Sequence, residues 1–421
     1  MILLRTTVKY LAFFWWFTGV ISLDCGPHGI YYPEDTLLGL TPACECSQCY
    51  EGPRCAIKTA NCLLDVTTVE LTMMREWFSQ QQSKLSSNLQ YEYHMGYLDQ
   101  SSGLFAQTNS RTRRDRISGI LNSTIRALHR KVGNVEDLDE RLLVVGAGAM
   151  QLISASMYAL CANSPVGKQC PIFTKRPFWG EFEDVSKVHS PRVRWMKSKS
   201  DYQPSDVDEI IEIVTNPNNP DGRANVGIFN TTKTIHDSVY NWPSFPTPHT
   251  HLDSTDPAII VFSLSKLSGY AASRVGWALI KNASVAQAMH EHIFLNGQGA
   301  GVEAQYRAVR ILQSITDSID THGEYFAAVR TKMQSRWTRL ERAINGSRFS
   351  IDGVSGQAFA WLRCHAGDAK VLREGGLRVS NGTGFGAADS DPHVRIVMGV
   401  DDSNFDEMIA RLTRVIRDIA S

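Results

Sequence analysis

Several features are scarce or missing in this sequence of 421 residues, and each absence excludes a class of protein. The 43 basic and 43 acidic side chains cancel, so no excess positive charge is available for binding nucleic acid. Glycine and proline contents are ordinary and no internal repeat is visible, which excludes collagen-like and low-complexity chains. An apolar fraction of 43% excludes an intrinsically disordered chain. The sequence therefore predicts a folded protein of two or three domains without a nucleic-acid partner.

A hydrophobic run long enough to span a membrane comfortably is also missing from the N-terminus. Residues 11–21 are apolar, Arg5 and Lys9 precede them, and the small residue Ser22 follows. This pattern is typical of a secretory signal peptide over residues 1–22, and a signal anchor that tethers the protein to a membrane is the alternative. N-x-[ST] sequons, which suit a protein of the secretory pathway (secreted, vacuolar or in the ER lumen), stand at Asn122, Asn230, Asn282, Asn345 and Asn381.

Cysteine is concentrated in one short stretch, residues 24–63, which has few aliphatic side chains. It contains six of the nine cysteines: Cys25, Cys44, Cys46, Cys49, Cys55 and Cys62. Because such a stretch cannot build an apolar core, we expect disulfide bridges to hold it together. Zinc binding is the alternative, although no histidine stands at zinc-finger spacing. Of the remaining cysteines, Cys161 and Cys170 are the favoured pair and Cys364 the free thiol, with three buried thiols as the alternative.

From about residue 64 the sequence is typical of a globular domain. Three short apolar runs predict buried strands, each followed by a turn rich in glycine, proline or serine. They are residues 142–145, 210–215 and 258–262. Helical patterns lie between the runs, so we expect an α/β fold with a mostly parallel sheet, whose ligands bind at the carboxyl ends of the strands. A final helix is predicted to bury one face, made of Phe405, Ile409, Leu412, Ile416 and Ile419.

The turns after the first two predicted strands carry candidate binding groups. Residues 146–151 (GAGAMQ) offer backbone N–H groups at the start of a helix, where a phosphate can bind, and a plain strand–helix turn is the alternative. The third glycine of a dinucleotide fingerprint is absent, which disfavours a nicotinamide dehydrogenase. Residues 216–222 (NPNNPDG) form a rigid turn that can hold an amide side chain in place, or a simple surface turn.

The turn after the third predicted strand contains Lys266. A lysine at the end of a buried apolar strand is costly unless it is paired or covalently used, and desolvation lowers its pKa as a Schiff-base lysine requires. A lysine that reaches solvent is the alternative. Ser263 and Arg274 can hold a phosphate beside it. Earlier in the chain, Asp237 and Tyr240 are placed to interact with a protonated ring nitrogen and a phenolic oxygen.

Together these motifs resemble the fold type I pyridoxal-phosphate (PLP) enzymes, the aspartate aminotransferase superfamily. Residues 44–55 read C-x-C-x-x-C-Y-x-G-x-x-C, which resembles an EGF-like module. With this module in front, the chain resembles the alliinase family, which includes plant C–S lyases and tryptophan aminotransferase-related proteins. The most specific parts are residues 216–222, residues 265–274 (SKLSGYAASR) and the cysteine spacings, and the resemblance runs over nearly the whole chain from Cys25 onward.

The resemblance implies a domain organisation. An EGF-like module over residues 24–63 would precede a PLP-dependent catalytic region over residues 64–421. That region would contain a large domain with a mostly parallel sheet at about 110–295. A smaller C-terminal α/β domain would run from about 300–421 and include the 64–109 arm. The family also implies the bridges Cys25–Cys44, Cys46–Cys55 and Cys49–Cys62.

The resemblance also implies roles for individual residues around the cofactor. Lys266 would bind PLP covalently and later move the Cα proton, and Asp237 would keep the pyridine nitrogen protonated. Asn219 and Tyr240 would hydrogen-bond the ring oxygen O3′. The cofactor phosphate would lie against Gly148, Ala149, Ser263 and Arg274.

Three further residues would complete the site. Trp179 would stack on the cofactor ring, although the adjacent Phe178 is an alternative. Arg395 would bind the substrate α-carboxylate, and Tyr97 would reach the cofactor of the other subunit in a homodimer. A strand-face arginine and an amphipathic tyrosine are the alternatives for these last two residues. No metal site is implied.

The function implied first is a PLP-dependent C–S lyase. It would act by β-elimination on S-substituted L-cysteines or their sulfoxides and release a sulfenate, pyruvate and ammonia. An aminotransferase for tryptophan or a similar amino acid, with a 2-oxo acid acceptor, is the alternative. A second alternative is an extracellular binding module on an inactive PLP fold. Residues 267–270 (LSGY) differ from the usual plant pattern, so the plant substrate does not transfer directly. The EGF-like module leaves room for a partner that the sequence does not identify.

Overall fold

The computed structural model describes residues 24–32, 43–66, 73–74, 119–162, 164–165, 168–203, 209–229, 231–246, 258–321, 324–365, 367–388 and 391–420. The expected signal peptide, Tyr97 and the sequon at Asn230 lie outside these residues. Contacts divide the chain into two compact units, Met1–Cys62 and Leu63–Ser421. Among the described residues, no helix combines the length and the apolar character that a membrane crossing requires.

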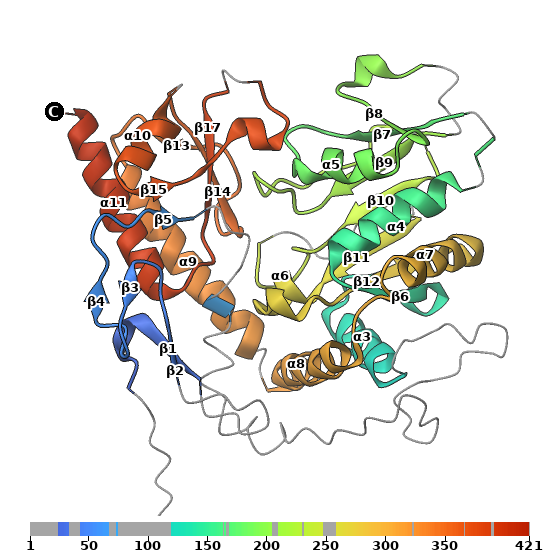
Figure 1. The fold of residues 1–421 in the computed structure, drawn as a ribbon, viewed down its shortest axis with the longest axis horizontal. Coiled ribbons are helices and arrows are strands. Elements are labelled where there is room, and N and C mark those ends of the chain that lie inside the picture. Colours follow the sequence, from blue (N-terminus) through green and yellow to red (C-terminus); the bar gives the residue numbers. More distant parts are fainter. Residues whose placement is uncertain are drawn as a thin grey trace, which may run out of the picture. The chain divides into compact units, whose positions relative to one another are not determined.

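The N-terminal unit consists of two small antiparallel ladders joined by disulfides (Figure 1). After the short helix η1 (Gly26–His28), β1 (Gly29–Tyr32) pairs with β2 (Ala43–Cys46), and β3 (Tyr50–Glu51) pairs with β4 (Ile57–Lys58). The bridges join the same pairs that the family resemblance implies: Cys25–Cys44, Cys46–Cys55 and Cys49–Cys62. All six sulfurs are therefore engaged with one another and are not available as zinc ligands.

A seven-stranded sheet forms the centre of the second unit (Figure 1). Its order is β6 (Leu142–Gly146), β12 (Gly276–Ile280), β11 (Ile259–Ser263), β10 (Thr234–Asp237), β9 (Ile211–Thr215), β7 (Cys170–Thr174) and β8 (Val193–Trp195). Only β12 runs against its neighbours in this sheet, so the sheet is mostly parallel, as predicted. The three predicted strands are β6, β9 and β11. Most strand residues are buried, which explains why these strands appear in the sequence as mostly apolar runs without alternation.

Helices pack against this sheet and against one another. α4 (Ala149–Cys161) contacts β6, β11 and β12 and packs along α7 (Ala283–Leu295), while α5 (Glu181–Val188) contacts β8. α3 (Gly119–Val132) packs against α8 (Val302–Asp320). The Cys161–Cys170 bridge fastens the end of α4 to the start of β7, and Cys364 is a free buried thiol.

A second, antiparallel sheet lies in the C-terminal part of the chain. Its order is β13 (Ser350–Ile351), β14 (Phe359–Arg363), β17 (His393–Val397) and β16 (Ser380–Asn381). The helices of this part are α9 (Glu324–Ile344), α10 (Asp368–Glu374) and α11 (Asp402–Ala420). A separate parallel pair joins β5 (Leu64–Asp65) to β15 (Leu377–Arg378).

The buried face of α11 is rotated slightly from the predicted one. Phe405 and Leu412 are buried as expected, but Met408 and Val415 complete the buried stripe. The predicted members Ile409, Ile416 and Ile419 are only half-buried. Both stripes have helical spacing, and the packing of α11 against α9 selects between them.

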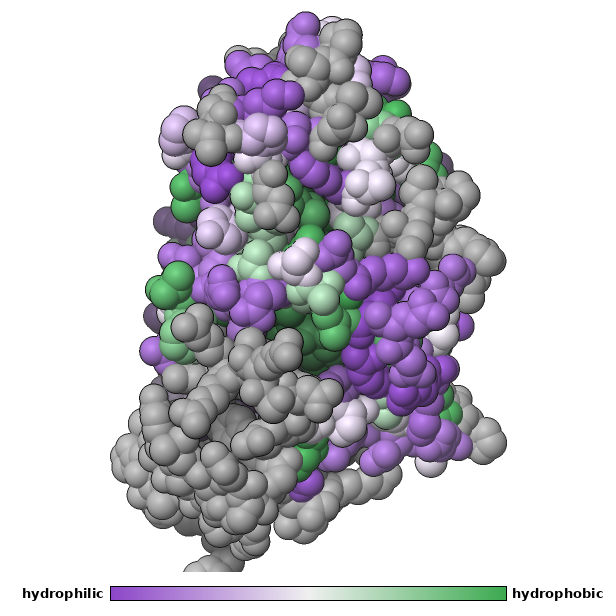
Figure 2. Space-filling view, turned by 90° about the vertical axis from the view of Figure 1, so that its right-hand side faces the viewer, coloured by the Kyte–Doolittle hydropathy of each residue, from purple (hydrophilic) through white to green (hydrophobic). Residues whose placement is uncertain are grey.

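Part of the molecular surface is apolar. On the face in Figure 2, apolar side chains gather toward the middle and hydrophilic ones surround them. Among the described residues, Val188 and Leu295 are the most exposed large apolar side chains, at 77% and 80%. They stand at the last positions of α5 and α7, where the helices end.

Candidate active site

Buried polar atoms without a partner gather where the central strands end. Among the described residues, Thr215, Asn216, Ser238, Tyr240 and Ser265 each bury a side-chain oxygen that makes no hydrogen bond. These residues lie at or just beyond the carboxyl ends of β9, β10 and β11. A buried polar atom without a partner costs about 1–3 kcal/mol, so such a cluster indicates a polar ligand that these atoms would contact.

Lys266 lies on α6 (Leu264–Ser268), a five-residue helix that follows β11 directly. Ser263 begins this helix, and its Oγ accepts a hydrogen bond from Ser265 N at 3.2 Å. Gly269 ends it in the left-handed conformation, with φ of 79°. Leu264 and Leu267 are buried and anchor α6, while the side chain of Lys266 is half-buried. β11 and α6 thus hold the amine of Lys266 at the carboxyl end of a central strand.

Asp237 is the last residue of β10 and is buried between β9 and β11. Burial raises the pKa of Asp237 to about 7, while a hydrogen bond from Val239 N and the positive charge of Lys266 oppose the shift. At neutral pH the Asp237 carboxyl is therefore fully ionised only when a cation lies close to it. The protonated pyridine nitrogen of PLP would supply that cation, so Asp237 fits the predicted cofactor.

Tyr240 follows β10 and is also buried. Its ring lies edge-on to Phe359, with 5.2 Å between ring centroids. Burial raises the pKa of Tyr240 and the charge of Arg395 opposes that shift, so the hydroxyl remains a donor at neutral pH. A donor without a partner among the described residues fits the phenolic oxygen of the cofactor.

Arg395 comes from β17 and meets the 216–222 turn. Its Nη1 donates to Asn219 Oδ1 at 2.8 Å, which leaves Asn219 Nδ2 as a donor toward the cofactor. The guanidinium lies over the rings of Phe359 and Phe385, at 4.4 Å and 4.7 Å from their centroids. Burial lowers the pKa of Arg395 to about 10, which still leaves it protonated at neutral pH. The structure therefore brings together a fixed cation and the predicted ring-oxygen donors.

A cradle for an anion lies at the start of α4, where Gly148 has φ of 87°. Arg274 Nη2 donates to Ala147 O at 3.3 Å, and a Cβ on Gly148 would lie only 2.6 Å from that nitrogen. Only glycine therefore lets the guanidinium approach this closely. Ser263 ends β11, and one strand, β12, separates β11 from β6. In this register Gly276 of β12 pairs with Ser263 on one side and with Gly146 on the other. The four predicted phosphate ligands thus occupy one corner of the sheet.

Trp179 and Phe178 have different surroundings. Phe178 is buried in the core, and its ring centroid lies 5.4 Å from that of Trp195. Trp179 is half-buried and lies edge-on to Phe182. Because Phe178 is occupied by core packing, Trp179 remains the candidate for stacking on the cofactor ring.

One charged residue near the site gave no clear signal in the sequence. Glu181 is exposed at the first position of α5, where an acidic side chain usually serves the helix dipole. Partial desolvation and the neighbouring Asp184 raise the pKa of Glu181, while the charges of Lys266 and Arg395 oppose the shift. Glu181 is therefore within electrostatic reach of both cations of the site.

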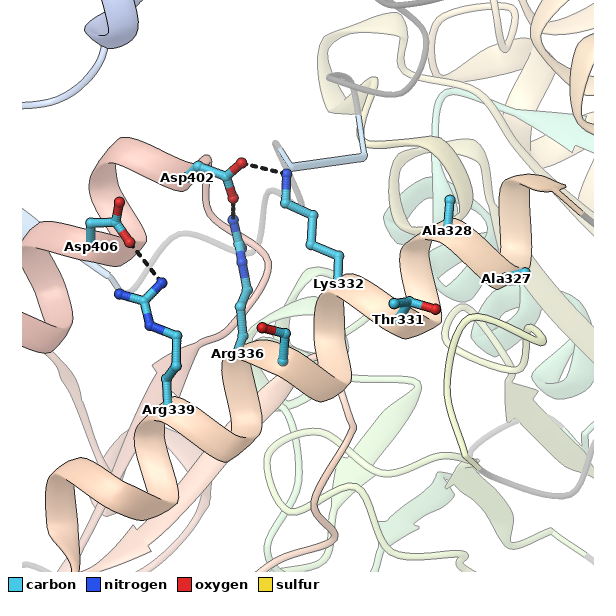
Figure 3. Close-up of a pocket in the computed structure, with 9 residues that line it drawn as sticks. Ala327, Ala328, Thr331, Lys332, Arg336, Arg339, Asp402 and Asp406 are labelled. Carbon is cyan, nitrogen blue, oxygen red and sulfur yellow. Dashed lines mark hydrogen bonds and ion pairs between the residues drawn. The ribbon is translucent and has the colours of Figure 1, made fainter.

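A surface groove of about 790 Å³ lies elsewhere, along α9 and the start of α11 (Figure 3). None of the predicted site residues lines it. Asp402 accepts from Lys332 Nζ at 2.7 Å and Arg336 Nη2 at 2.6 Å, and Arg339 pairs with Asp406 at 2.7 Å. Each of these charged side chains has a partner of opposite charge inside the groove, and so the groove is not a candidate for the catalytic centre.

The chain is similar to known proteins in both sequence and fold. Residues 73–416 match the family described as Allinase, and residues 18–62 match the Alliinase EGF-like domain. Tryptophan aminotransferase-related protein 1 of Oryza sativa subsp. japonica is 34% identical over 69% of this chain and 71% of its own length. Alliin lyase 1 of Allium sativum is 27% identical over 94% of this chain and 84% of its own length.

Solved structures give the same fold at lower identity. The aspartate aminotransferase of Thermus thermophilus, determined with maleate, has a TM-score of 0.59 at 15% identity and covers 84% of this chain and 91% of its own. YbdL of Escherichia coli, described as having a methionine aminotransferase function, has a TM-score of 0.59 at 14% identity, covering 84% of this chain and 94% of its own. These similarities confirm the predicted fold type I architecture.

Proposed function

The chain belongs to the alliinase family of PLP-dependent enzymes, and from this premise we propose that it is a carbon–sulfur lyase. Its substrates would be S-substituted L-cysteines or their sulfoxides. The observation that carries the proposal is the cluster of buried polar atoms at the carboxyl ends of β9, β10 and β11. Asp237 ends β10, Lys266 follows β11, and Arg395 Nη1 donates to Asn219 in the turn after β9 at 2.8 Å. The neighbouring EGF-like unit, which matches the family's own module, favours the lyase among the reactions that this site supports.

Bound PLP supplies an electron sink that stabilises the carbanion left when the substrate loses its Cα proton. Lys266 would hold the cofactor covalently and then take that proton. Asp237 would keep the ring nitrogen protonated, and Asn219 and Tyr240 would donate to the ring oxygen. Arg395 would bind the α-carboxylate and so orient the Cα–H bond toward Lys266.

The fate of the deprotonated substrate depends on its side chain. Where the sulfur group on Cβ is itself a good leaving group, as in a sulfoxide, the Cβ–S bond would break and the electron pair would leave with the sulfenate. Water would then hydrolyse the remaining fragment to pyruvate and ammonia. Where that group leaves poorly, Lys266 would deliver the proton away from Cα, water would release the substrate as a 2-oxo acid, and the amino group would pass to a 2-oxo acid acceptor. The second reaction is the alternative function, favoured by the relatives described as tryptophan aminotransferase-related proteins.

Product analysis separates the two reactions. The purified protein would be incubated with S-methyl-L-cysteine sulfoxide, and separately with L-tryptophan plus pyruvate. We expect pyruvate and ammonia in equal amounts from the first mixture and little alanine from the second. Alanine from the second mixture without ammonia from the first would make the protein an aminotransferase.

Assembly and compartment are further parts of the proposal. We propose a secretory-pathway protein that has lost residues 1–22 and carries glycans on some of its sequons, of which Asn282, Asn345 and Asn381 are exposed. The disulfide-bridged unit supports an oxidising compartment. We also propose a homodimer in which Tyr97 of each subunit reaches the other subunit's cofactor. Light scattering of the purified protein would measure the mass of the assembly.

A further inference from the structure

We propose that Arg223 is a positioning residue, which acts through Asp352 to hold Asn219 and Arg395 in the geometry that binds a substrate carboxylate. The inference rests on the proposed function in one respect only, the role of Arg395 as ligand of that carboxylate. We call the set of residues Asp221, Arg223, Asp352 and His393 the clasp.

The first part of the clasp closes the turn that carries Asn219. Asp221 is buried, and its Oδ1 accepts from Asn218 Nδ2 at 2.8 Å and from Arg223 N at 3.1 Å. Arg223 Nη1 donates to Asp221 Oδ2 at 3.1 Å, and Arg223 O accepts from Asn218 N at 2.9 Å. The turn is thus fastened on both sides of Asn219, and Arg223 supplies three of the contacts.

The second part joins this turn to the segment between β13 and β14. Arg223 Nη2 donates to Asp352 Oδ1 at 2.6 Å, and Val354 N donates to Asp221 O at 2.8 Å. A Cβ on Gly353 would lie 2.7 Å from Asp221 O, so the two backbones approach closely. Arg223 and Asp352 are 50% and 36% exposed, so the ion pair lies at the surface above a tight backbone contact.

The third part returns to the strand of Arg395. Asp352 Oδ2 lies 2.9 Å from His393 Nε2, and His393 Nδ1 lies 2.9 Å from Asp391 Oδ1. Both ring nitrogens face carboxylate oxygens, and both can donate only when the ring is protonated. The ring of His393 also stacks on Trp361, with 5.0 Å between centroids. His393 begins β17 two residues before Arg395, so the contact fixes the start of the strand that carries the guanidinium.

These contacts, together with two short stretches of backbone, form a closed circuit. It runs from Asn219 through Asp221, Arg223, Asp352 and His393 to Arg395, and Arg395 Nη1 closes it on Asn219 Oδ1 at 2.8 Å. Partial burial by itself raises the pKa of Asp352, but the hydrogen bonds from Arg223 and His393 outweigh it and hold the pKa below the ordinary value. The Asp352 carboxylate is therefore stabilised in its charged form by the contacts that it makes within the clasp.

The test compares Arg223→Gln with Arg223→Lys and with Arg130→Gln as the matched control. Arg130 also pairs with an aspartate at the surface, Asp139, at 2.5 Å, but on α3 and η3 (Leu138–Glu140). The probe is the α-methyl analogue of S-methyl-L-cysteine, which has a carboxylate but no Cα proton to lose. Its dissociation constant would be measured from the change in the visible spectrum of the holoenzyme, together with KM, kcat and PLP affinity.

We expect Arg223→Gln to weaken probe binding and raise KM about tenfold, with kcat and PLP affinity within about twofold of wild type. Arg223→Lys should recover part of the loss. Lysine keeps a positive charge facing Asp352, but it cannot contact Asp221 at the same time. Arg130→Gln should bind the probe as wild type does. Unchanged probe binding in Arg223→Gln would overturn the inference, and so would a drop in PLP affinity as large as the rise in KM.

A second variant covers a folding failure of Arg223→Gln. Asp352→Asn keeps the side-chain shape and one acceptor but removes the charge, and it should raise KM by a similar factor. An unchanged KM in Asp352→Asn would also overturn the inference.

Arg395→Gln separates the two levels of the proposal. If it leaves probe binding unchanged, the role of Arg395 is wrong. If only Arg395→Gln weakens binding, the role of Arg223 is wrong. Because tryptophan also has an α-carboxylate, the test serves whichever reaction the enzyme performs.

Discussion

The two units of this protein are stabilised in different ways. In the N-terminal unit, three disulfides take the place of an apolar core, and Cys25, Cys49 and Cys55 are themselves among its buried residues. In the second unit, buried strands pack under helices, and the strands hold side chains that are expensive to bury, such as Asp237 at the end of β10 and Arg395 in the middle of β17. Covalent links maintain a small fold, whereas a large core can keep charged groups in fixed positions for chemistry. Catalytic precision in this protein therefore depends on burial, and the following variants test that difference between the units.

The largest effect is expected from Lys266→Ala. The variant should lose the visible absorbance of covalently bound PLP, and turnover should fall by at least about 10³-fold, because both the covalent anchor and the proton carrier are gone. Absorbance spectroscopy of the purified protein measures the first and product assays the second. Lys187→Ala, which removes an exposed lysine on α5, is the control. A normal cofactor spectrum in Lys266→Ala would contradict the assignment.

Asp237→Asn should reduce turnover roughly 10²-fold, because asparagine cannot keep the ring nitrogen protonated.

The pH dependence of stability in the same variant tests whether the Asp237 carboxyl is desolvated by burial. In cofactor-free protein, the folded pKa of Asp237 is raised to about 7, so its contribution to stability is present below about pH 4 and is lost as pH rises toward 7. Urea midpoints of the cofactor-free protein should therefore fall between pH 5 and 7 in wild type and fall less in Asp237→Asn. Equal pH dependence in both proteins would show that this carboxyl is not desolvated.

Mild reduction should separate the two units. Each bridge in a small module contributes about 2–4 kcal/mol, so reduction should unfold residues 24–62 first. The second unit should keep its cofactor absorbance, because its core does not depend on those bridges. Mass spectrometry after thiol labelling would follow the six cysteines while absorbance follows the cofactor. Simultaneous loss of both signals would mean that the units do not fold independently.

The smallest effect is expected from Glu181→Gln. Removing this carboxylate should lower the KM of an anionic substrate about two- to fivefold, because a negative charge no longer opposes the α-carboxylate near Arg395. Glu183→Gln on the same helix is the matched control, because Glu183 pairs with Lys187 instead. KM would be measured at low and at high salt, where screening should reduce the difference. An increase in KM would instead indicate that Glu181 binds the substrate directly.

Much of the fold could be predicted because buried parallel strands have a simple sequence pattern. The runs that became β6, β9 and β11 are mostly apolar, with Glu212 of β9 as the charged exception, since both faces of the sheet are covered. β10 was missed because only four residues, Thr234–Asp237, belong to it and three of them are polar or charged. The family resemblance and its disulfide-rich module were recognised from cysteine spacing, but that spacing by itself leaves the pairing open.

The candidate site divides in a similar way. Lys266 and Asn219 could be identified because short turns with distinctive composition carry them. The clasp could not, since Arg223 and Asp352 are joined across 129 positions of the chain and neither belongs to a recognisable motif. Glu181 resembles any acidic residue at a helix start, and only the tertiary arrangement brings it near two cations. The roles of the site residues, and the domain limits near residues 63 and 300, stay predictions.

The pair of β5 and β15 has a practical consequence for anyone who wishes to dissect the protein. Leu64 N donates to Gly376 O and Val66 N to Arg378 O, both at 3.0 Å, so these residues belong to the catalytic unit although they come only two and four positions after the last module cysteine, Cys62. A shortened gene that begins a few codons too late would strip a strand from β15 and leave an open edge prone to self-association. Exchange or removal of the module is therefore best attempted with a junction at Leu63, where one residue separates bridge from ladder.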